Sequence, residues 1–312
     1  MTSAGIIGTG SFIPPKILTN DDFVKQGLET SHDWIVERTG IIERHVVQEE
    51  TSSEMGYYAA QQALDSSGLS PQDIDIVIVA TSTPDNPGFP STACLIQKRL
   101  GLRPVPAFDL SAACTGFTYA LTTAAQFIET GFSKHALVVA TDRLSKYVDR
   151  SDRSLCILFG DGAGAVVLGK VPRYGIITST LYAEGGHADI LTMDATPLIH
   201  MNGKAVFKVA IEALVPAVLD ALNRACLTVS DITWFIPHQA NLRIMEYARE
   251  KLGLRRECML VNIHKYGNTS AASIPIAYNE AVRENKIKSG DIVVMVGFGA
   301  GFTWGVTILR HV

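Results

Sequence analysis

The sequence lacks an apolar stretch long enough to cross a membrane. Its longest apolar runs, IDIVIVAT and HALVVAT, have the length of a strand and fall well short of the roughly 20 residues of a membrane-spanning helix. The opening residues, MTSAGIIGTGSFIPP, have neither the basic flank nor the long apolar core of a signal peptide. We therefore expect no membrane partner and no export signal.

Cysteine is scarce, and its spacing disfavours the common disulfide and zinc frameworks. The five cysteines are odd in number and well separated, and four lie inside apolar runs, as is typical of reduced thiols. No two of them form a CxxC pair, and the eight histidines include no HxH or HxxxH pair, which disfavours a structural zinc site. We expect a cytoplasmic protein with no structural metal.

Positive charge is also limited. The net charge is −4 at pH 7, and the sequence has no long stripe of Lys and Arg to neutralise phosphates, which argues against general nucleic-acid binding. In contrast, 47% of the 312 residues are apolar, which is enough to fill a sizeable core. The chain is therefore expected to fold as a soluble globular protein, with one large domain or two ordinary ones.

What the sequence does contain is an internal repeat. Four pairs of segments match in the same order in the two halves, and the last pair shares a G-x-G-A-G core. The pairs are 69–81 with 227–239, 99–111 with 251–263, 135–140 with 291–296, and 160–169 with 297–306. Each match is weak alone, but their common order indicates a duplicated unit.

The predicted helices and strands follow the same order in both halves. Residues 51–54 are typical of a capping box that opens a helix closed by Gly68, and 76–80 is an apolar run suited to a strand buried on both faces. Further helices are expected at 91–100, 115–130, 204–225, 240–252 and 269–284, and further strands at 105–110, 136–141, 233–236, 259–262 and 292–296. The alternation predicts a duplicated α/β fold with a mainly parallel sheet in each half, and we place the halves at 1–170 and 171–312.

The segment DLSAACTGF places Cys114 between a predicted strand and a predicted helix. A cysteine at a helix start lies at the positive end of the helix dipole, near free backbone N–H groups, which lowers its pKa and favours the nucleophilic thiolate. The alternative is a packed core thiol. The other four cysteines keep that interpretation: Cys94, Cys156, Cys226 and Cys258. The turn position and small neighbours of Cys114 make it the candidate nucleophile.

Two polar residues follow corresponding strands of the second half. His238 comes just after the predicted strand 233–236, and Asn268 lies in the turn KYGNTSAA. Because the carboxyl ends of parallel strands collect the chemistry of α/β sheets, both residues are expected to meet Cys114 at the junction of the halves. Taken alone, His238 could be a structural histidine and Asn268 an ordinary turn residue.

The Gly-rich segment GFGAGFTWG offers a tight backbone turn near the end of the chain. It precedes a strand rather than a helix, so it is not a dinucleotide-binding fingerprint. Its N–H groups could instead form half of an oxyanion hole together with the N–H of Cys114.

Longer motifs carry a resemblance to a known family. The segments WIVERTGIIER, FPSTACLIQ, SAACTGF, DRSLCILFGDGAGA, PHQANLRI, KYGNTSAASIPIA and GFGAGFTWG together span nearly the whole chain. They resemble β-ketoacyl-acyl carrier protein synthase III, a family of condensing enzymes in the thiolase-like superfamily, and the Cys, His, Asn order separates it from thiolases, which use a second cysteine. The resemblance implies the five-layered α/β/α/β/α thiolase fold, a homodimer, and a reaction without a metal or other cofactor.

The resemblance also implies a ping-pong acyltransferase reaction that starts type II fatty acid synthesis. Cys114 would attack an acyl-CoA thioester, with acetyl-CoA the expected starter, while backbone N–H groups of Cys114 and Ala300 hold the oxyanion. Malonyl-acyl carrier protein would then lose carbon dioxide. Its enolate, held by His238 and Asn268, would attack the acyl-cysteine to give a 3-oxoacyl-acyl carrier protein. Phe298 matches a family phenylalanine packed beside this site.

Further positions carry over from the family one at a time. Trp34 and Arg153 match the pair that sandwiches the CoA adenine, with Arg38 near the phosphates, although Trp34 by itself is also typical of a core aromatic. Positions in the pantetheine tunnel match Gly203, Phe207, Ala240 and Asn241. Four residues match positions of the acyl pocket: Phe89, Leu144, Leu158 and Met201. Of these, Phe89 is expected to arrive from the partner subunit. Four basic residues match a surface on which an acidic carrier protein docks in this family: Lys208, Arg243, Arg249 and Lys251. The alternative is that they form an ordinary solvated face.

Three functional interpretations stay open at this point. The first is the synthase, and the second is a relative on the same fold that uses another acceptor in polyketide, alkylquinolone or ester formation. The third is a cysteine hydrolase or a catalytically silent acyl-binding protein. The intact Cys, His and Asn set disfavours a silent protein, and the GNTSAAS stretch disfavours relatives that alter it. The starter acyl group is not determined by the sequence.

Overall fold

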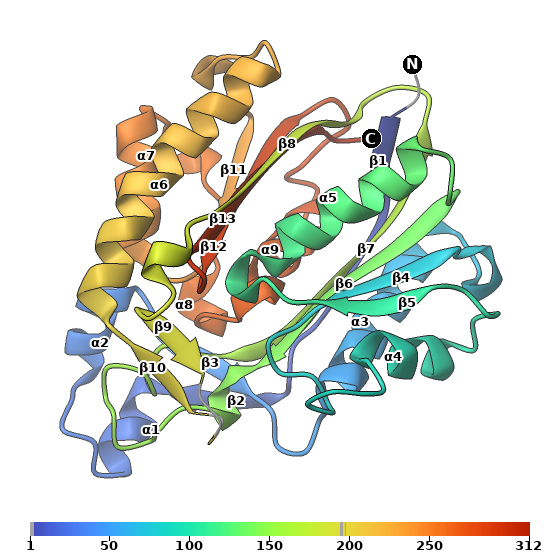
Figure 1. Cartoon of the computed structure of the whole chain (residues 1–312). Helices are drawn as coiled ribbons and strands as arrows, with labels where there is room; N and C mark the ends of the chain where they lie inside the picture. The colour runs from blue at the N-terminus through green and yellow to red at the C-terminus, as the bar shows by residue number, and fades with distance from the viewer. Residues whose placement is uncertain (1–2, 194–195, 197) are drawn as a thin grey trace.

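Two mixed sheets organise the chain in the computed structural model, which describes residues 3–193, 196 and 198–312 (Figure 1). The first sheet has five strands in the order β1-β7-β6-β4-β5. Its strands are β1 (Ser3–Phe12), β4 (Ile76–Ala80), β5 (Ala107–Leu110), β6 (His135–Arg143) and β7 (Asp161–Val171). The second sheet has the order β11-β12-β13-β8 and consists of β8 (Gly175–Ala183), β11 (Trp234–Pro237), β12 (Ile292–Gly299) and β13 (Thr303–Arg310).

The prediction of mainly parallel sheets is wrong. Parallel pairing is confined to β4 with β5, β4 with β6, and β11 with β12, whereas the pairs β1–β7, β6–β7, β12–β13 and β13–β8 are antiparallel. The physical reason is clearest at β12 and β13, which are joined by only the three residues 300–302. So short a connection returns the chain beside the strand it has just left, and that pairing is necessarily antiparallel.

Helices form three layers around the two sheets, as Figure 1 shows. Between the sheets lie α5 (Gly116–Glu129) and α9 (Ser273–Arg283), while α3 (Ser52–Ser67) and α4 (Thr92–Leu100) cover the outer face of the first sheet. The outer face of the second sheet is covered by α6 (Gly203–Arg224) and α7 (Leu242–Leu252). The predicted five-layered α/β/α/β/α architecture is therefore confirmed.

Strand β4 shows why the layers hold together. All five of its residues are buried, and their side chains alternate between two cores. Ile76 and Ile78 belong to the core that contains Phe117 of α5, whereas Val77 and Val79 belong to the core against α3 and α4. The continuous apolar run in the sequence thus has the expected meaning, a strand buried on both faces.

The predicted helix boundaries have physical causes in the caps. Thr51 and Glu54 form a capping box at the start of α3, and Gly68 ends that helix with φ +70°. Helix α4 begins after Ser91, whose side chain accepts from the N–H of Cys94, and ends at Gly101 with φ +65°. All the helices expected from the sequence are present within a few residues of their predicted bounds.

One predicted strand is absent. The segment 259–262 makes a single isolated bridge to Phe235, and the N–H of Leu260 donates to the Phe235 oxygen at 2.9 Å. The Gln239 side chain replaces the missing ladder, since its Nε2 donates to the Leu260 oxygen at 3.3 Å and its Oε1 accepts from the N–H of Asn262 at 3.0 Å. A buried side chain therefore satisfies backbone groups that a strand would have paired.

Elements not expected from the sequence complete the fold. Apart from β1 and β8, which were not expected either, they are β2 (Lys16–Thr19) paired with β3 (Glu43–Val46), β9 (Leu191–Met193) paired with β10 (Ile199–Met201), and the helices α1 (Asn20–Lys25), α2 (His32–Thr39) and α8 (Ile263–Tyr266). They gather at the lower left of Figure 1, beside α6 and α7. In the described part of the chain, no helix has both the length and the apolar composition needed to span a bilayer.

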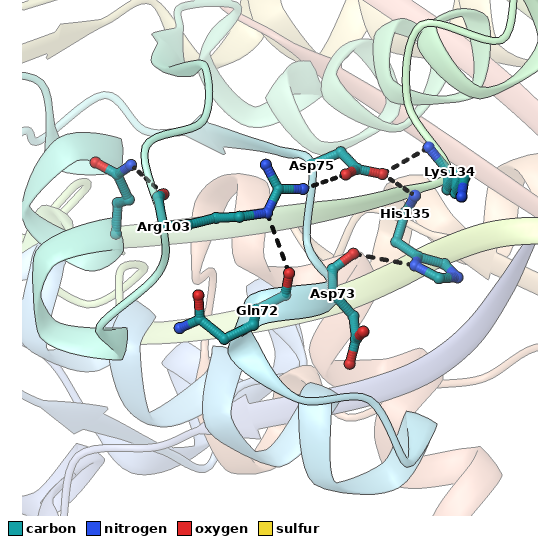
Figure 2. A network of polar contacts seen from close by, with 7 residues as sticks. Gln72, Asp73, Asp75, Arg103, Lys134 and His135 are labelled. Atoms are coloured by element: carbon teal, nitrogen blue, oxygen red, sulfur yellow. Dashed lines mark hydrogen bonds and ion pairs between the residues drawn. The ribbon is translucent and has the colours of Figure 1, made fainter.

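Figure 2 shows how the start of β4 is tied to its neighbours. The Asp75 carboxylate accepts from the backbone N–H groups of Lys134 at 2.7 Å and His135 at 3.0 Å, and it pairs with the Arg103 guanidinium. Arg103 Nε also donates to the backbone oxygen of Gln72 at 3.2 Å. These contacts anchor the amino ends of β4 and β6, which run parallel to each other, so their carboxyl ends emerge together on the side of the catalytic cysteine candidate.

Candidate active site

A cavity of about 660 Å³ contains the three residues that the sequence analysis placed at strand ends. Cys114, His238 and Asn268 are buried at its inner end, and Phe298 and Gly299 of β12 line the same wall. At the other end the lining includes exposed residues of α2 and α6, so the cavity reaches solvent. The fold thus brings together residues that are far apart in the sequence.

The backbone around Cys114 is tightly constrained. Cys114 lies in the short 3-10 turn Ala113–Thr115, between β5 and α5, and Ala113 has φ +45°, a conformation that L-residues rarely adopt. The end of β12 passes so close that a Cβ on Gly299 would lie 2.7 Å from the Cys114 nitrogen. Glycine is therefore required at position 299 for the second half to pack against Cys114.

The environment of the Cys114 thiol overturns one expectation. The pKa of Cys114 is raised to about 12, first by burial and then by the nearby carboxylate of Asp142, while the hydroxyl of Ser270, 3.4 Å from Sγ, opposes the shift. The prediction that the helix start lowers this pKa is wrong, because burial removes the water that would stabilise the thiolate. The resting thiol is therefore protonated at neutral pH.

Asp142 lies behind the nucleophile and is fully buried. Its Oδ1 accepts from the Ser82 N–H at 2.7 Å, and its Oδ2 accepts from the Ala271 N–H at 3.4 Å. The Ser270 hydroxyl also contacts this carboxyl group, and burial is the main cause of its raised pKa. Ser270 thus stands between a carboxylate and the thiol.

His238 is held in place from two sides. Its backbone N–H donates to the Val296 oxygen at 2.8 Å, which fixes the residue at the end of β11 beside β12. Its ring Nδ1 lies 2.7 Å from the Ser273 hydroxyl, and its ring packs edge-on against Phe298 with centroids 5.1 Å apart. Burial lowers the pKa of His238 to about 3, so the imidazole is neutral at physiological pH.

Asn268 is presented to the cavity by a turn. Its backbone N–H donates to the Leu158 oxygen at 2.9 Å and its backbone oxygen accepts from the Gly160 N–H at 3.0 Å. Gly267, just before it, has φ +65° and ψ −158°, a combination that only glycine adopts readily. The side-chain Oδ1 accepts from the Ser270 N–H at 2.9 Å, which leaves the amide N–H groups for the cavity that Asn268 lines.

The expected CoA residues gather at the outer part of the cavity. Six of the seven line it: Trp34, Arg38, Gly203, Phe207, Ala240 and Asn241. The seventh, Arg153, stacks on the Trp34 ring with its guanidinium carbon 4.8 Å from the centroid, and the guanidinium carbon of Arg38 lies 4.5 Å from the same centroid. Trp34 is half-buried rather than a core aromatic, so one ring is flanked by two cations at the mouth of the cavity.

The expected acyl-pocket residues divide into two groups. Leu158 and Met201 line the cavity, and Leu144 packs with both of them in one buried cluster without lining it. The Phe89 side chain is 90% exposed and belongs to neither the cavity nor that cluster. Ala300, expected to supply an oxyanion N–H, lies in the turn between β12 and β13, where its oxygen accepts from the Thr303 hydroxyl at 3.1 Å.

The four expected docking residues also differ from one another. Lys208, Arg243 and Lys251 are exposed, and the guanidinium carbon of Arg243 lies 5.9 Å from the ring centroid of Phe207, which lines the cavity. The side chain of Arg249 is only 16% exposed, pairs with Glu246 at 2.5 Å, and donates to a backbone oxygen. Arg249 therefore stabilises α7 and its C-terminal turn.

Sequence reasoning missed Asp142, Ser270 and Ser273. The two serines lie in the GNTSAAS stretch that carried the family resemblance, but a serine in a turn has no pattern that would single it out. Asp142 follows an apolar strand and has the sequence context of an ordinary strand-end residue. Among the residues that the structure describes, no group of three or more His, Cys, Asp or Glu side chains is placed to hold a metal ion.

Comparisons with known proteins agree with this geometry. Residues 108–185 match a family model described as 3-Oxoacyl-[acyl-carrier-protein (ACP)] synthase III, and residues 222–311 match a model of the C terminal part of the same family. A curated relative, the Beta-ketoacyl-[acyl-carrier-protein] synthase III of Oceanobacillus iheyensis, is 48% identical over 308 residues, which is 98% of each chain.

Solved structures give the same result. The 3-oxoacyl-[acyl-carrier-protein] synthase III of Aquifex aeolicus VF5 is 46% identical with a TM-score of 0.97, covering 100% of both chains. The priming beta-ketosynthase from the R1128 polyketide biosynthetic pathway is 37% identical with a TM-score of 0.94, covering 99% of this chain and 96% of that one. Because these identities extend over almost the full length of each chain, the protein belongs to the 3-oxoacyl-[acyl-carrier-protein] synthase III family of condensing acyltransferases.

Proposed function

We propose that this chain condenses an acyl-CoA starter with malonyl-acyl carrier protein and so begins type II fatty acid synthesis. The observation that carries the proposal is one cavity lined by Cys114 together with two neutral side chains that can donate hydrogen bonds, His238 and Asn268. A nucleophile accounts for acyl transfer, and paired neutral donors suit the enolate that forms on decarboxylation.

In the first half-reaction the Cys114 sulfur attacks the thioester carbonyl and CoA leaves. The thiol is protonated at rest, so its proton must depart as the carbon–sulfur bond forms, and it ends on the departing CoA sulfur. The exchange leaves no net charge, because acyl-CoA and the Cys114 thiol are converted into acyl-Cys114 and the CoA thiol. Backbone N–H groups of Cys114 and Ala300 are proposed to hold the transient oxyanion.

In the second half-reaction the malonyl thioester loses carbon dioxide. The electron pair of the broken carbon–carbon bond becomes an enolate, whose charge lies largely on the thioester oxygen. His238 and Asn268 donate hydrogen bonds to that oxygen, and the enolate carbon attacks the acyl-cysteine to release Cys114 as a thiolate, which takes up one proton from solvent and so restores the resting thiol. The lowered pKa of His238 means that the imidazole is neutral. The N–H of a neutral imidazole is only weakly acidic, so it can donate a hydrogen bond to the enolate oxygen without transferring its proton.

Substrate binding is proposed to follow the length of the cavity. The CoA adenine would stack on Trp34 by displacing one of its two guanidinium neighbours, Arg153 being the expected partner on the other face. The pantetheine arm would follow Phe207 and Asn241 inward. The carrier protein, which is acidic in this family, would dock near the exposed Arg243.

We also propose a cytoplasmic homodimer that uses no cofactor beyond its thioester substrates. The support for a dimer is Phe89, whose bulky apolar side chain is 90% exposed in the single chain. Burial of such a side chain against a second subunit would be favourable, and it would let Phe89 close the acyl pocket of that subunit.

The experiment that tests the proposal is intact-protein mass spectrometry followed by condensation. Incubation with acetyl-CoA, longer straight-chain and branched acyl-CoAs should add one acyl group, and peptide mapping should find it on Cys114. The acyl-enzyme should then yield a 3-oxoacyl product with malonyl-acyl carrier protein. A label on Cys94, Cys156, Cys226 or Cys258, or release of a free acid in place of condensation, would contradict it.

A priming enzyme for polyketide synthesis is the second candidate function, and it is the less favoured one, because the R1128 priming beta-ketosynthase is 37% identical to this chain against 48% for the synthase III of Oceanobacillus iheyensis. The chemistry is the same, and only the starter acyl group and the carrier protein would differ. The starter series above distinguishes the two. Preference for acetyl-CoA supports the fatty acid assignment, whereas preference for a longer or branched starter together with a dedicated carrier protein supports priming.

A further inference from the structure

The hydroxyl of Ser273 makes an unusual pair of contacts at the start of α9. Its Oγ lies 2.7 Å from His238 Nδ1, and the backbone N–H of Gln239 donates to the same oxygen at 3.3 Å. Ser273, His238 and Gln239 are all essentially fully buried. No water is needed to explain the arrangement, because each group already faces a protein partner.

The protons of this group can be assigned by counting donors and acceptors. The Gln239 N–H can only donate, so it uses one lone pair of the serine oxygen. Ser273 has one proton of its own, and among the residues that the structure describes the acceptor within reach of it is His238 Nδ1. If Nδ1 carried a proton, two donors would face one oxygen while the hydroxyl proton would lack a buried acceptor, which is costly.

We infer that Ser273 is a positioning residue that donates its hydroxyl proton to Nδ1 of His238 and thereby holds the imidazole in the tautomer protonated at Nε2. The inference deepens the proposed function, because only that tautomer offers Nε2–H to the enolate oxygen. The neutral state of the buried ring, with its pKa lowered to about 3, agrees with the assignment, since a neutral ring has one proton to place.

The same logic holds for the second donor. The Ser270 N–H donates to Asn268 Oδ1, so the amide N–H groups of Asn268, and not its oxygen, are directed to the cavity. Two serines three residues apart therefore set the polarity of the two donors, one through its hydroxyl and one through its backbone. The tautomer also withholds Nε2 as a base for the Cys114 thiol, which separates this site from a Cys–His hydrolase.

The first test is the imidazole nitrogen spectrum of the full-length protein labelled with nitrogen-15 histidine. The His238→Gln variant assigns the His238 signals by their loss. The expected spectrum at neutral pH has a protonated Nε2 and an unprotonated Nδ1. A protonated Nδ1 in the wild-type protein would overturn the inference whatever the variants do.

The second test compares Ser273→Ala with Ser273→Thr. Loss of the hydroxyl should give a mixture of tautomers and should slow decarboxylation of malonyl-acyl carrier protein by roughly tenfold, the effect of one hydrogen bond, with acylation of Cys114 nearly unchanged. Ser273→Thr keeps a hydroxyl and should restore both the single tautomer and the rate. An equal loss of acylation and decarboxylation with an unchanged tautomer would overturn the inference, because it would mean a packing role alone.

Ser270→Ala is the matched control. It removes another buried serine hydroxyl of the same segment but leaves the contact with Nδ1 untouched, so the His238 tautomer should not change. The inference can also be separated from the proposed function. A wild-type protein with Nε2–H that fails to decarboxylate malonyl-acyl carrier protein would keep the assignment of the proton and refute the proposed reaction.

Discussion

The two halves of the chain share one plan of strands. The order β1-β7-β6-β4-β5 in the first sheet corresponds to β8-β13-β12-β11 in the second, and β1 and β8 pair antiparallel with β7 and β13. A short capped turn precedes the matching strands β4 and β11, with Ser70 and Asp73 before β4 and Thr228 and Asp231 before β11. Strand β8 is thus the counterpart of β1, a match that the sequence repeat did not reveal.

The halves differ where the fifth strand would lie. Strand β5 pairs with β4 over four residues, whereas 259–262 makes one bridge and is otherwise held by the Gln239 side chain. Freed from a ladder, the second copy turns through α8 and Gly267 and brings Asn268 to the cavity. The first copy keeps the strand and places Cys114 beyond its end. One framework therefore places the proposed nucleophile on one side of the cavity and the two proposed hydrogen-bond donors on the other.

The electrostatics of the two halves differ in the same way. Burial is the main cause of the raised pKa of Cys114, and the buried carboxyl group of Asp142 raises it further. Around His238 burial alone accounts for the lowered pKa. The difference teaches that Cys114 has a second buried acid beside it, whose own pKa is also raised by burial, whereas no charged group contributes to the lowered pKa of His238.

The largest expected effects come from separating the two sides by mutation. Cys114→Ala should abolish acylation and leave some decarboxylation, because both enolate donors remain. His238→Ala and Asn268→Ala should still form acyl-Cys114 but lose decarboxylation and condensation by at least ~100-fold, the typical effect of removing one oxyanion donor. Intact-protein mass measures acylation, and carbon dioxide release from malonyl-acyl carrier protein measures the rest.

One outcome would break this division. If His238→Ala cannot be acylated while Asn268→Ala decarboxylates normally, then His238 activates the thiol, and the hydrolase interpretation gains support. Melting temperatures of the three variants, close to that of the wild-type protein, would show that the comparison concerns chemistry and not folding.

The next prediction concerns the segment 259–262, where the Gln239 side chain takes the place of a paired strand. Gln239→Met keeps the side-chain length but leaves buried N–H and C=O groups of the 259–262 region without partners, so the free energy of unfolding should fall by at least about 2 kcal/mol. Decarboxylation should fall more than acylation, because the chain that carries Asn268 loses its anchor. Chemical denaturation and the two assays above measure these effects.

The first half offers a matched control for that change. Gln97 of α4 likewise donates from Nε2 to backbone oxygens before β5, those of Arg103 at 3.1 Å and Val105 at 3.4 Å, but it is only half-buried, whereas Gln239 is fully buried. Gln97→Met should lower the free energy of unfolding by less than Gln239→Met does, because water can replace the lost hydrogen bonds at a partly exposed position. Equal losses in the two variants would show that Gln239 is not special to the second half.

A third effect concerns the thiol itself. Because the Asp142 charge raises the pKa of Cys114 and the Ser270 hydroxyl lowers it, Asp142→Asn should lower this pKa and Ser270→Ala should raise it. At a fixed pH below the thiol pKa, alkylation of Cys114 by iodoacetamide should then be faster in the first variant and slower in the second. Mass spectrometry across a pH series measures both. Identical pH profiles would show that Asp142 serves only to hold the loop at Ser82.

Many helices and strands could be predicted from the local sequence, and there are physical causes for those that could not. The caps at Thr51 and Gly68 and the apolar run of β4 determine their elements over a few residues, so they were predicted correctly. The segment 259–262 has the composition of a strand, but its pairing is replaced by a distant side chain. Strands β1 and β8 were not predicted, because β1 pairs with β7 and β8 pairs with β13, and the paired segments are more than a hundred residues apart.

The candidate site was predictable in position but not in its electrostatics. Strand ends and the family motifs pointed to Cys114, His238 and Asn268, which the fold brings into one cavity. The pKa of Cys114 could not be predicted from its helix start, because burial by β12 and the charge of Asp142 come from other parts of the chain. For the same reason the contact of Ser273 with His238 was invisible before the fold was known.

The smallest expected effect compares the outer helices of the two halves. Arg243 of α7 is exposed beside the cavity, whereas Arg99 of the corresponding helix α4 pairs with Glu54 at 3.1 Å, away from it. If the carrier protein docks on the second half, Arg243→Glu should weaken use of malonyl-acyl carrier protein by roughly fivefold, the effect of about 1 kcal/mol from an exposed ion pair, and Arg99→Glu should not. Acyl transfer from CoA should stay nearly unchanged in both, and the loss should shrink as salt screens the charges. Equal losses of both half-reactions in Arg243→Glu, independent of salt, would mean that Arg243 supports the cavity wall at Phe207 rather than a protein partner.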